Sequence, residues 1–145
     1  MGLIVSSDNR DVWEPSLAVG YLFVDQIHSL ERLVGLESGV SPVVSDEVTI
    51  DPARFQSFIK GCLRILETSN NGPLVAMTAG PLLIAIALCH AITGKWPPVP
   101  EHLRNLVDDA DKVIGSQRNG WEIQRSFVSA EGSLAAFLPR VASNE

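Results

Sequence analysis

The stretch "GPLVAMTAGPLLIAIALCHAITGKW" (residues 72–96) decides the fold of this chain, because it carries no charged residue before Lys95. A membrane-spanning helix needs about 20 consecutive apolar residues, so this run is formally long enough to cross a bilayer. A helix that is apolar on all sides is also what a small helical protein places in the middle of its core. The run itself and the segments around it discriminate between these two alternatives.

Three features favour a core helix over residues 73–93. Gly80-Pro81 interrupts the run, and a proline inside a helix lacks the N–H for one hydrogen bond and collides with the carbonyl four residues earlier. We therefore expect Pro81 to break or kink the helix. Several alanines allow neighbouring helices to approach closely. The flanking segments are amphipathic, and their apolar faces need a central partner.

The segment before the run predicts a helix from Asp51 to about Thr68. Asp51-Pro52 is a start signal, because the Asp carboxylate caps free N–H groups and proline is tolerated in the first turn. Asn70-Asn71-Gly72 is the expected stop. Further upstream, Pro15-Ser16 opens another helix, which Gly35 ends. We expect a short extended segment at residues 3–6 and an ordered loop at 36–50, in which the alternation of Val48 and Ile50 with polar residues indicates one short extended pair.

Downstream of the run, a further helix begins near Pro100, and its predicted buried face includes Leu103, Leu106 and Ala110. A last short helix follows at residues 129–138, and residues 141–145 are expected to form a frayed tail. The sequence therefore predicts a mainly α single domain over residues 1–145. It would be a bundle of four to five helices around the apolar helix at about 73–93, with a short N-terminal extended segment.

The composition and net charge of the chain limit the classes of molecule that such a domain can bind. The 145 residues are 46% hydrophobic and 19% charged, which suits one globular domain, and the net charge is −6. An acidic surface repels phosphate, so we expect no nucleic-acid partner and instead another protein, with a basic surface. Cys62 and Cys89 both lie in apolar helical contexts and are expected to be free and buried.

Three stretches of the sequence together resemble a known protein family. They are "VWEPS" (12–16), "GLESGVSPVVSDEVTIDPARFQSFI" (35–59) and "NGW" (119–121). This pattern resembles a family of small, functionally uncharacterised actinobacterial proteins, mainly over residues 1–66. The resemblance implies a bacterial, cytoplasmic setting, and it carries over no catalytic residue. The core-helix interpretation of residues 73–93 predicts no membrane association.

Few groups of residues in the sequence could serve as a catalytic or metal-binding site. Asp25, His28, Glu31 and Arg32 lie about one helical turn apart, and a carboxylate beside an imidazole could act as a base or a metal ligand. We expect them instead to form a solvated helix face. The sequence contains no HExxH, CxxC, GxSxG, P-loop or GxGxxG pattern. We therefore predict no catalytic residue, no metal site and no cofactor.

Two functions from different classes remain. The first is a small acidic protein-binding module, such as an immunity or regulatory protein that neutralises its partner. Acidic groups steer a basic partner, and a tryptophan anchors it; the candidates are Asp46, Glu47, Asp108, Asp109, Asp111, Trp96 and Trp121. The alternative is a small helical enzyme or carrier with an apolar ligand pocket near Pro81, Cys89 and His90.

Overall fold

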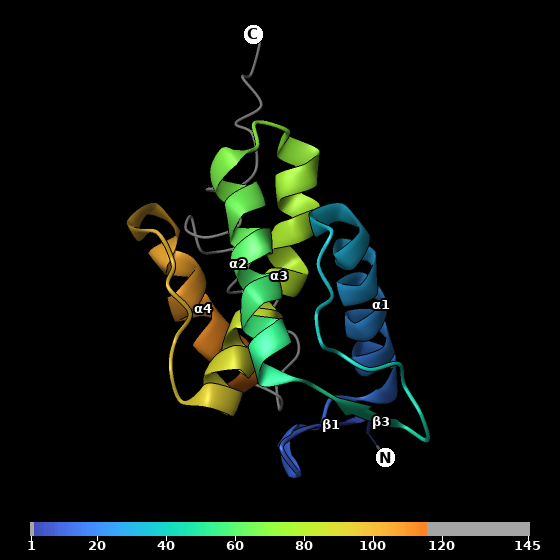
Figure 1. Cartoon of the computed structure of the whole chain (residues 1–145). Coiled ribbons are helices and arrows are strands. Elements are labelled where there is room, and N and C mark those ends of the chain that lie inside the picture. The colour runs from blue at the N-terminus through green and yellow to red at the C-terminus, as the bar shows by residue number, and fades with distance from the viewer. Residues whose placement is uncertain (1, 116–145) are drawn as a thin grey trace, which may run out of the picture.

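The computed structural model describes residues 2–115, and helices dominate this part of the chain (Figure 1). The mainly α fold is therefore confirmed. The predicted helix at 129–138, the tail at 141–145 and Trp121 lie outside the described residues. The elements in chain order are β1 (Ile4–Ser7), β2 (Arg10–Trp13), α1 (Leu17–Val34), β3 (Glu47–Thr49), α2 (Pro52–Thr68), α3 (Gly72–Thr93), the short 3-10 helix η1 (Glu101–Leu103) and α4 (Arg104–Gly115).

Helix α3 contacts α1, α2, α4 and β2, and Figure 1 shows α1 and α4 on opposite sides of the α2–α3 pair. Leu82, Leu83, Ala85, Ile86 and Leu88 are completely buried, although they project from different sides of the helix. Length and composition alone would let α3 cross a membrane, and 61% of its most apolar stretch is buried inside the protein. Its neighbours therefore cover most of the apolar surface that the sequence shows.

The α3 helix continues without interruption through Pro81, so the predicted break into two helices is wrong. A proline in a helix interior costs about 3 kcal/mol or more, because one backbone hydrogen bond is lost. Pro81 is itself buried, and the residues after it are buried on all sides. We attribute the continuous helix to this packing, which a local propensity argument does not include. A bend at Pro81 stays a prediction.

The starts of α2 and α3 follow local capping rules. The Asp51 carboxylate accepts a hydrogen bond from the N–H of Arg54 at 3.0 Å, and Pro52 is the first helical residue, so the predicted cap is confirmed. The Asn71 side chain accepts from the N–H of Leu74 at 3.1 Å in the same way. Asn71 therefore caps α3 only three residues after the end of α2 at Thr68, so the connection between the two helices is short.

The end of α3 is held by a residue from far upstream. Gly94 adopts the left-handed backbone that a helix C-cap often needs (φ 72°), and its N–H bonds the carbonyl of His90 at 2.8 Å. The Arg10 guanidinium donates to the carbonyls of Ala91 at 2.7 Å and Ile92 at 3.2 Å. Arg10 thus neutralises the negative end of α3 and ties it to β2.

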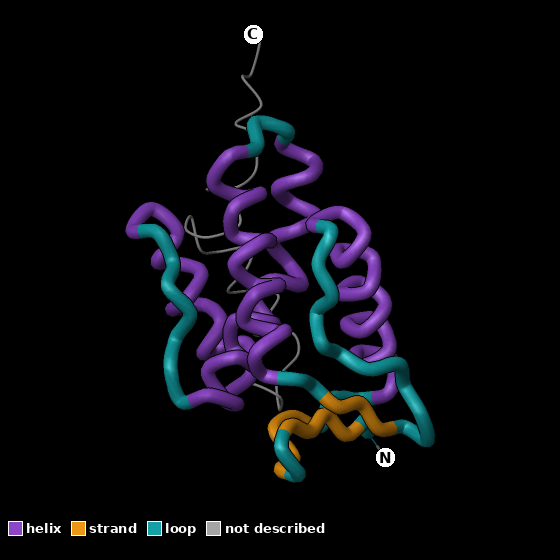
Figure 2. The backbone as a smooth tube through the Cα atoms, viewed as in Figure 1, coloured by secondary structure: helices purple, strands orange, loops and turns teal. Residues whose placement is uncertain are grey.

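The strands form one small sheet at the end of the helices, shown in orange in Figure 2, with the order β2-β1-β3. β1 pairs antiparallel with β2 and parallel with β3. Asp8 and Asn9 both have positive φ, as a tight type I′ hairpin turn requires. The sheet is larger than the extended segment predicted for residues 3–6. β2 is a short strand that was not predicted, and β3 lies in the extended pair expected around Val48 and Ile50, although its partner β1 is distant in sequence.

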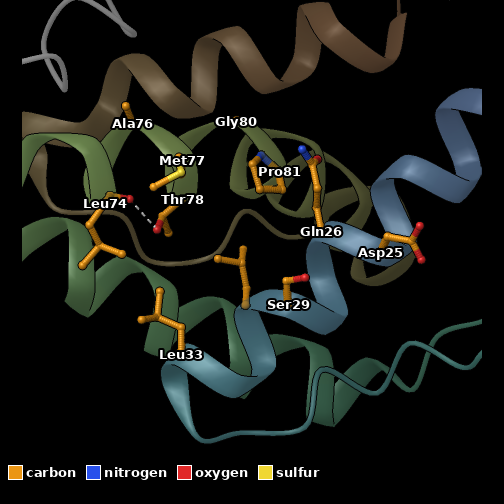
Figure 3. Close-up of a pocket in the computed structure, with 11 residues that line it drawn as sticks. Asp25, Gln26, Ser29, Leu33, Leu74, Ala76, Met77, Thr78, Gly80 and Pro81 are labelled. Atoms are coloured by element: carbon orange, nitrogen blue, oxygen red, sulfur yellow. Dashed lines mark hydrogen bonds between the residues drawn. The ribbon is translucent and has the colours of Figure 1, made fainter.

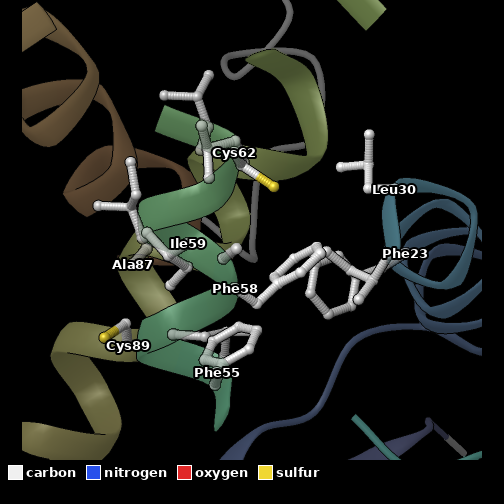
Figure 4. Close-up of a cluster of buried hydrophobic side chains, with 14 of the residues drawn as sticks. Phe23, Leu30, Phe55, Phe58, Ile59, Cys62, Ala87 and Cys89 are labelled. Carbon is white, nitrogen blue, oxygen red and sulfur yellow. The ribbon is translucent and has the colours of Figure 1, made fainter. Parts of the chain in front are cut away.

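Aromatic side chains join the helices in the core. Phe23 of α1 and Phe58 of α2 point toward one another in Figure 4, and Trp13 of β2 packs edge-on against Phe23 with ring centroids 5.5 Å apart. Cys62 and Cys89 are free and buried in this core, as predicted. Burial raises the pKa of the Cys62 thiol to about 12, so it behaves as a small apolar side chain.

Candidate functional site

Helix α1 carries more apolar residues than the core accepts. Its buried face consists of Gly20, Phe23, Val24, Ile27 and Leu30. A second set of positions recurs at spacings of three and four on a different side of the helix, which places them in one line. We call this line the outer stripe; it comprises Val19, Leu22, Gln26, Ser29 and Leu33, all of them exposed.

The outer stripe borders an open groove between α1 and α3. The groove has a volume of about 520 Å³ and is lined from α1 by Leu30 and Leu33 and from α3 by Leu74, Met77 and Pro81, among others. Figure 3 shows Leu33, Leu74 and Met77 at one end of this groove, with Asp25 and Gln26 at the other. We call it the α1–α3 groove. Its lining is mainly apolar, and Met77 is 69% exposed.

The polar margin of this surface is acidic. Asp25 is the charged residue that lines the α1–α3 groove among the described residues. One turn earlier on α1, the hydroxyl of Tyr21 donates to Asp46 at 3.3 Å. The pKa of Tyr21 is raised, first by desolvation and then by the Asp46 carboxylate. The predicted loop acids Asp46 and Glu47 therefore lie beside the start of α1.

A tight turn presents these two loop acids. Val44 and Glu47 exchange two backbone hydrogen bonds of 3.0 Å, and Ser45 and Asp46 between them both have positive φ. Short polar residues tolerate this backbone conformation best, which explains why the sequence folds this way here. Glu47 is exposed and Asp46 is half-buried.

His28 and Glu31 hold the loop that follows α1. The Nε2 atom of His28 lies 3.0 Å from the carbonyl oxygen of Val40, and the Glu31 carboxylate accepts from the N–H of Ser38 at 2.8 Å and from its hydroxyl. The solvated face predicted for these two residues is therefore wrong, because both bond the loop backbone. No group of three or more metal-binding side chains occurs within residues 2–115.

The predicted acids of α4 lie apart from the loop acids. Asp108 is exposed and Asp109 is half-buried on α4, which Figure 1 shows across the α2–α3 pair from α1. Desolvation raises the pKa of Asp109; Lys112 offsets this in part, and Asp108 adds to it. Asp111 lies on the same helix, and its side chain is outside the described part of the structure. The two acid groups therefore do not form one patch.

The structure separates the residues of the predicted pocket. Pro81 lines the α1–α3 groove, whereas Cys89 lines a different cavity together with Trp96. His90 stacks on Trp96 with ring centroids 3.9 Å apart and an interplanar angle of 4°. About 13 Å of helix axis separates Pro81 from His90 at 1.5 Å per residue. The described residues thus do not form one pocket around Pro81 and His90.

Sequence reasoning missed the outer stripe, although a signal for it exists. The positions 19, 22, 26, 29 and 33 follow the spacing of a helix–helix contact, but Gln26 and Ser29 interrupt their apolar character. In the sequence, the buried residues of α1 alternate with the residues of the outer stripe. The sequence alone therefore indicates a single broad apolar helix face.

Comparison with known proteins agrees with the resemblance in the sequence and extends it. No curated protein and no solved structure matches the chain. A model of a family of unknown function matches residues 1–116, which is more of the chain than the predicted 1–66. The match includes "VWEPS" and residues 35–59 but not "NGW", and the actinobacterial setting stays a prediction. It spans every element described above, and the chain therefore belongs to the family of unknown function DUF6086.

Proposed function

We propose that this chain is a protein-binding module that takes an amphipathic, basic helix of a partner protein into the α1–α3 groove. Binding would neutralise or regulate that partner, as an immunity or regulatory protein does. The observation that carries the proposal is the outer stripe, where Leu22 is 59% and Leu33 is 44% exposed beside a groove of about 520 Å³. Exposed apolar side chains beside a groove are typical of interaction sites.

The shape of the surface favours a helical partner. Two helices form the walls of the α1–α3 groove, and its apolar residues Leu33, Leu74 and Met77 lie together at one end (Figure 3). A helix that binds in such a groove inserts apolar residues spaced by three or four positions. Three residues of the outer stripe, Gln26, Ser29 and Leu33, line the groove at the matching spacing.

The charge of the margin favours a basic partner. Asp25 lines the groove, Asp46 bonds Tyr21 one turn away, and the whole chain has a net charge of −6. Lysine or arginine residues beside the apolar positions of the partner helix would meet these carboxylates. Charges at the margin of an interface mainly raise the association rate, whereas buried apolar anchors slow dissociation.

We further propose a cytoplasmic setting in which α3 acts as a core helix and does not enter a membrane. The burial of α3 against three helices supports this part of the proposal. The native protein is then expected in the soluble fraction after lysis without detergent. Recovery only with membranes would contradict it.

Affinity capture with matched variants tests the binding function. Tagged protein captures partners from the native host, in parallel with Leu33→Gln and Leu36→Gln. Leu33 and Leu36 are 44% and 43% exposed, but only Leu33 lines the groove. We expect Leu33→Gln to lower capture of a specific protein about tenfold or more, as loss of an interface anchor does, and Leu36→Gln to leave capture unchanged.

A photo-cross-linking residue in place of Met77 then locates the bound protein. We expect it to cross-link to a segment of the partner that combines apolar and basic residues. Equal capture by both leucine variants would contradict the proposal. So would the absence of a cross-link from position 77 to the captured protein.

A further inference from the structure

A second concave site lies on the other side of the molecule, away from the α1–α3 groove. It is a cavity of about 200 Å³ between α2 and the segment that follows α3. Gln56 and Lys60 reach it from α2, where they lie one helical turn apart, and Lys95 and Trp96 reach it from the segment after α3. Thr93 and Cys89 line it from α3 itself. We call this site the lysine cavity.

The lysine cavity is positively charged in an acidic protein. Its charged residues are Lys60 and Lys95, and none of the described residues that line it is acidic. Among the side chains that the structure describes there is one salt bridge, between Arg54 and Glu37, so neither lysine has a carboxylate of that set within 4.0 Å. The α1–α3 groove, by contrast, contains Asp25. Both lysines are exposed, and two lysines that line one cavity raise the local positive potential.

The end of α3 does not cancel this potential. A free helix C-terminus is partly negative and would disfavour an anion. Here Arg10 binds the carbonyls of Ala91 and Ile92, and the Thr93 hydroxyl donates to the carbonyl of Cys89 at 2.8 Å. The charge of Arg10 therefore offsets the negative end of the helix beside the cavity.

A fixed aromatic ring completes the lysine cavity. Trp96 is half-buried, and its ring is held by the parallel stack with His90. A held ring offers a flat apolar surface at little cost in side-chain entropy. The Gln56 amide supplies neutral polar groups beside it, whereas the Thr93 hydroxyl bonds the backbone of Cys89 and Lys95. This combination of two cations, neutral polar groups and one flat wall matches a small molecule that is anionic at one end and planar and apolar at the other.

We propose that the lysine cavity binds a small aromatic carboxylate. The carboxylate would accept charge-assisted hydrogen bonds from Lys60 and Lys95, and the apolar ring would contact Trp96. This site is independent of the α1–α3 groove and of the proposed protein-binding function.

Nuclear magnetic resonance titration of the full chain with benzoate tests the proposal. The signal is the indole N–H of Trp96, assigned with Trp96→Phe in a separate sample. We expect a saturable shift with benzoate, and about tenfold or weaker binding of the neutral analogue benzamide, because a hydrogen bond to a charged group is worth about 1.5–3 kcal/mol. Inorganic phosphate, which has the charge but no ring, should also bind at least about tenfold more weakly.

Variants distinguish the site from non-specific binding. We expect Lys60→Met and Lys95→Met each to weaken benzoate binding about tenfold, while Lys112→Met on α4 and Leu33→Gln in the groove leave it unchanged. Benzoate affinity that is unaffected by both lysine changes, equal affinity for benzamide or phosphate, or no saturable shift would each overturn the proposal. Because Leu33→Gln tests the groove alone, the two proposals fail separately.

Discussion

Helices α1 and α3 are both rich in apolar residues, but they use them differently. Most apolar side chains of α3 are buried against α1, α2 and α4, and Met77, at 69% exposed, is the main exception. Those of α1 divide into a buried face and the outer stripe, in which Leu22 is 59% exposed. Apolar residues in α3 thus mainly stabilise the fold, whereas the exposed apolar residues of α1 contribute little to the core. This difference is what makes α1 the candidate for recognition.

The comparison predicts its largest effect for paired truncations in the two helices. Ile86→Ala in α3 should lower the free energy of unfolding by about 2–5 kcal/mol, because it leaves a cavity in a fully buried region. Leu22→Ala in α1 should change it by less than about 0.5 kcal/mol. Chemical denaturation measures both. A similar loss in the two variants would show that the outer stripe is part of the core.

Helix α2 contacts both α1 and α3, and removing its N-terminal cap is expected to have the next largest effect on stability. Asp51→Ala should destabilise the protein by about 0.5–2 kcal/mol, because the N–H of Arg54 loses its partner. Asp25→Ala serves as the control, since this carboxylate lines the α1–α3 groove and caps no helix start. Equal effects in urea denaturation would argue against the capping role of Asp51.

The hydrogen bonds from Arg10 of β2 to the end of α3 allow the last turns of α3 and α1 to be compared. Arg10→Ala should cost about 0.5–1 kcal/mol, a reduced value because Arg10 is exposed, and it should speed amide exchange in the last turn of α3. The last turn of α1, which ends at Gly35, should exchange as before. Uniform acceleration in both helices would mean that Arg10 acts on the whole fold.

The smallest effect is expected on α4, which covers α3 from the other side. The pKa of Asp109 is raised in the folded state, so its ionisation opposes folding and stability falls as pH rises through that raised pKa. Asp109→Asn should therefore stabilise the protein by a few tenths of a kcal/mol at pH 7, a value limited by partial exposure. The difference should vanish below the ordinary carboxyl pKa. A constant difference across a pH series of denaturation curves would contradict this.

Local signals predicted most helices because their chemistry is local. Asp51-Pro52 and Gly35 set helix ends by hydrogen bonds to nearby backbone, and the structure confirms both. The break expected at Pro81 is wrong because packing outweighs a local cost. The alternation of Val48 and Ile50 points to an extended segment at β3, but its pairing with β1 was not predicted because β1 is distant in the chain.

The candidate site was harder to predict than the fold. The loop acids and the α4 acids look equivalent in sequence, but only the fold shows that Asp46 reaches Tyr21 whereas Asp109 lies across the molecule. The partner roles proposed for these acids stay predictions. The lysine cavity joins Lys60 and Lys95 from two separate elements, so no local pattern brings them together.

The contact between Arg10 and the end of α3 also sets an order of events during synthesis. The arginine leaves the ribosome first, but its acceptor carbonyl at Ile92 lies 82 residues later. At about 5–20 residues per second, the hairpin that carries it waits roughly 4–16 s before that carbonyl exists. β1 can pair with β3 about 45 residues earlier in synthesis, so the hairpin is held at one edge first and its tie to the end of α3 is added later.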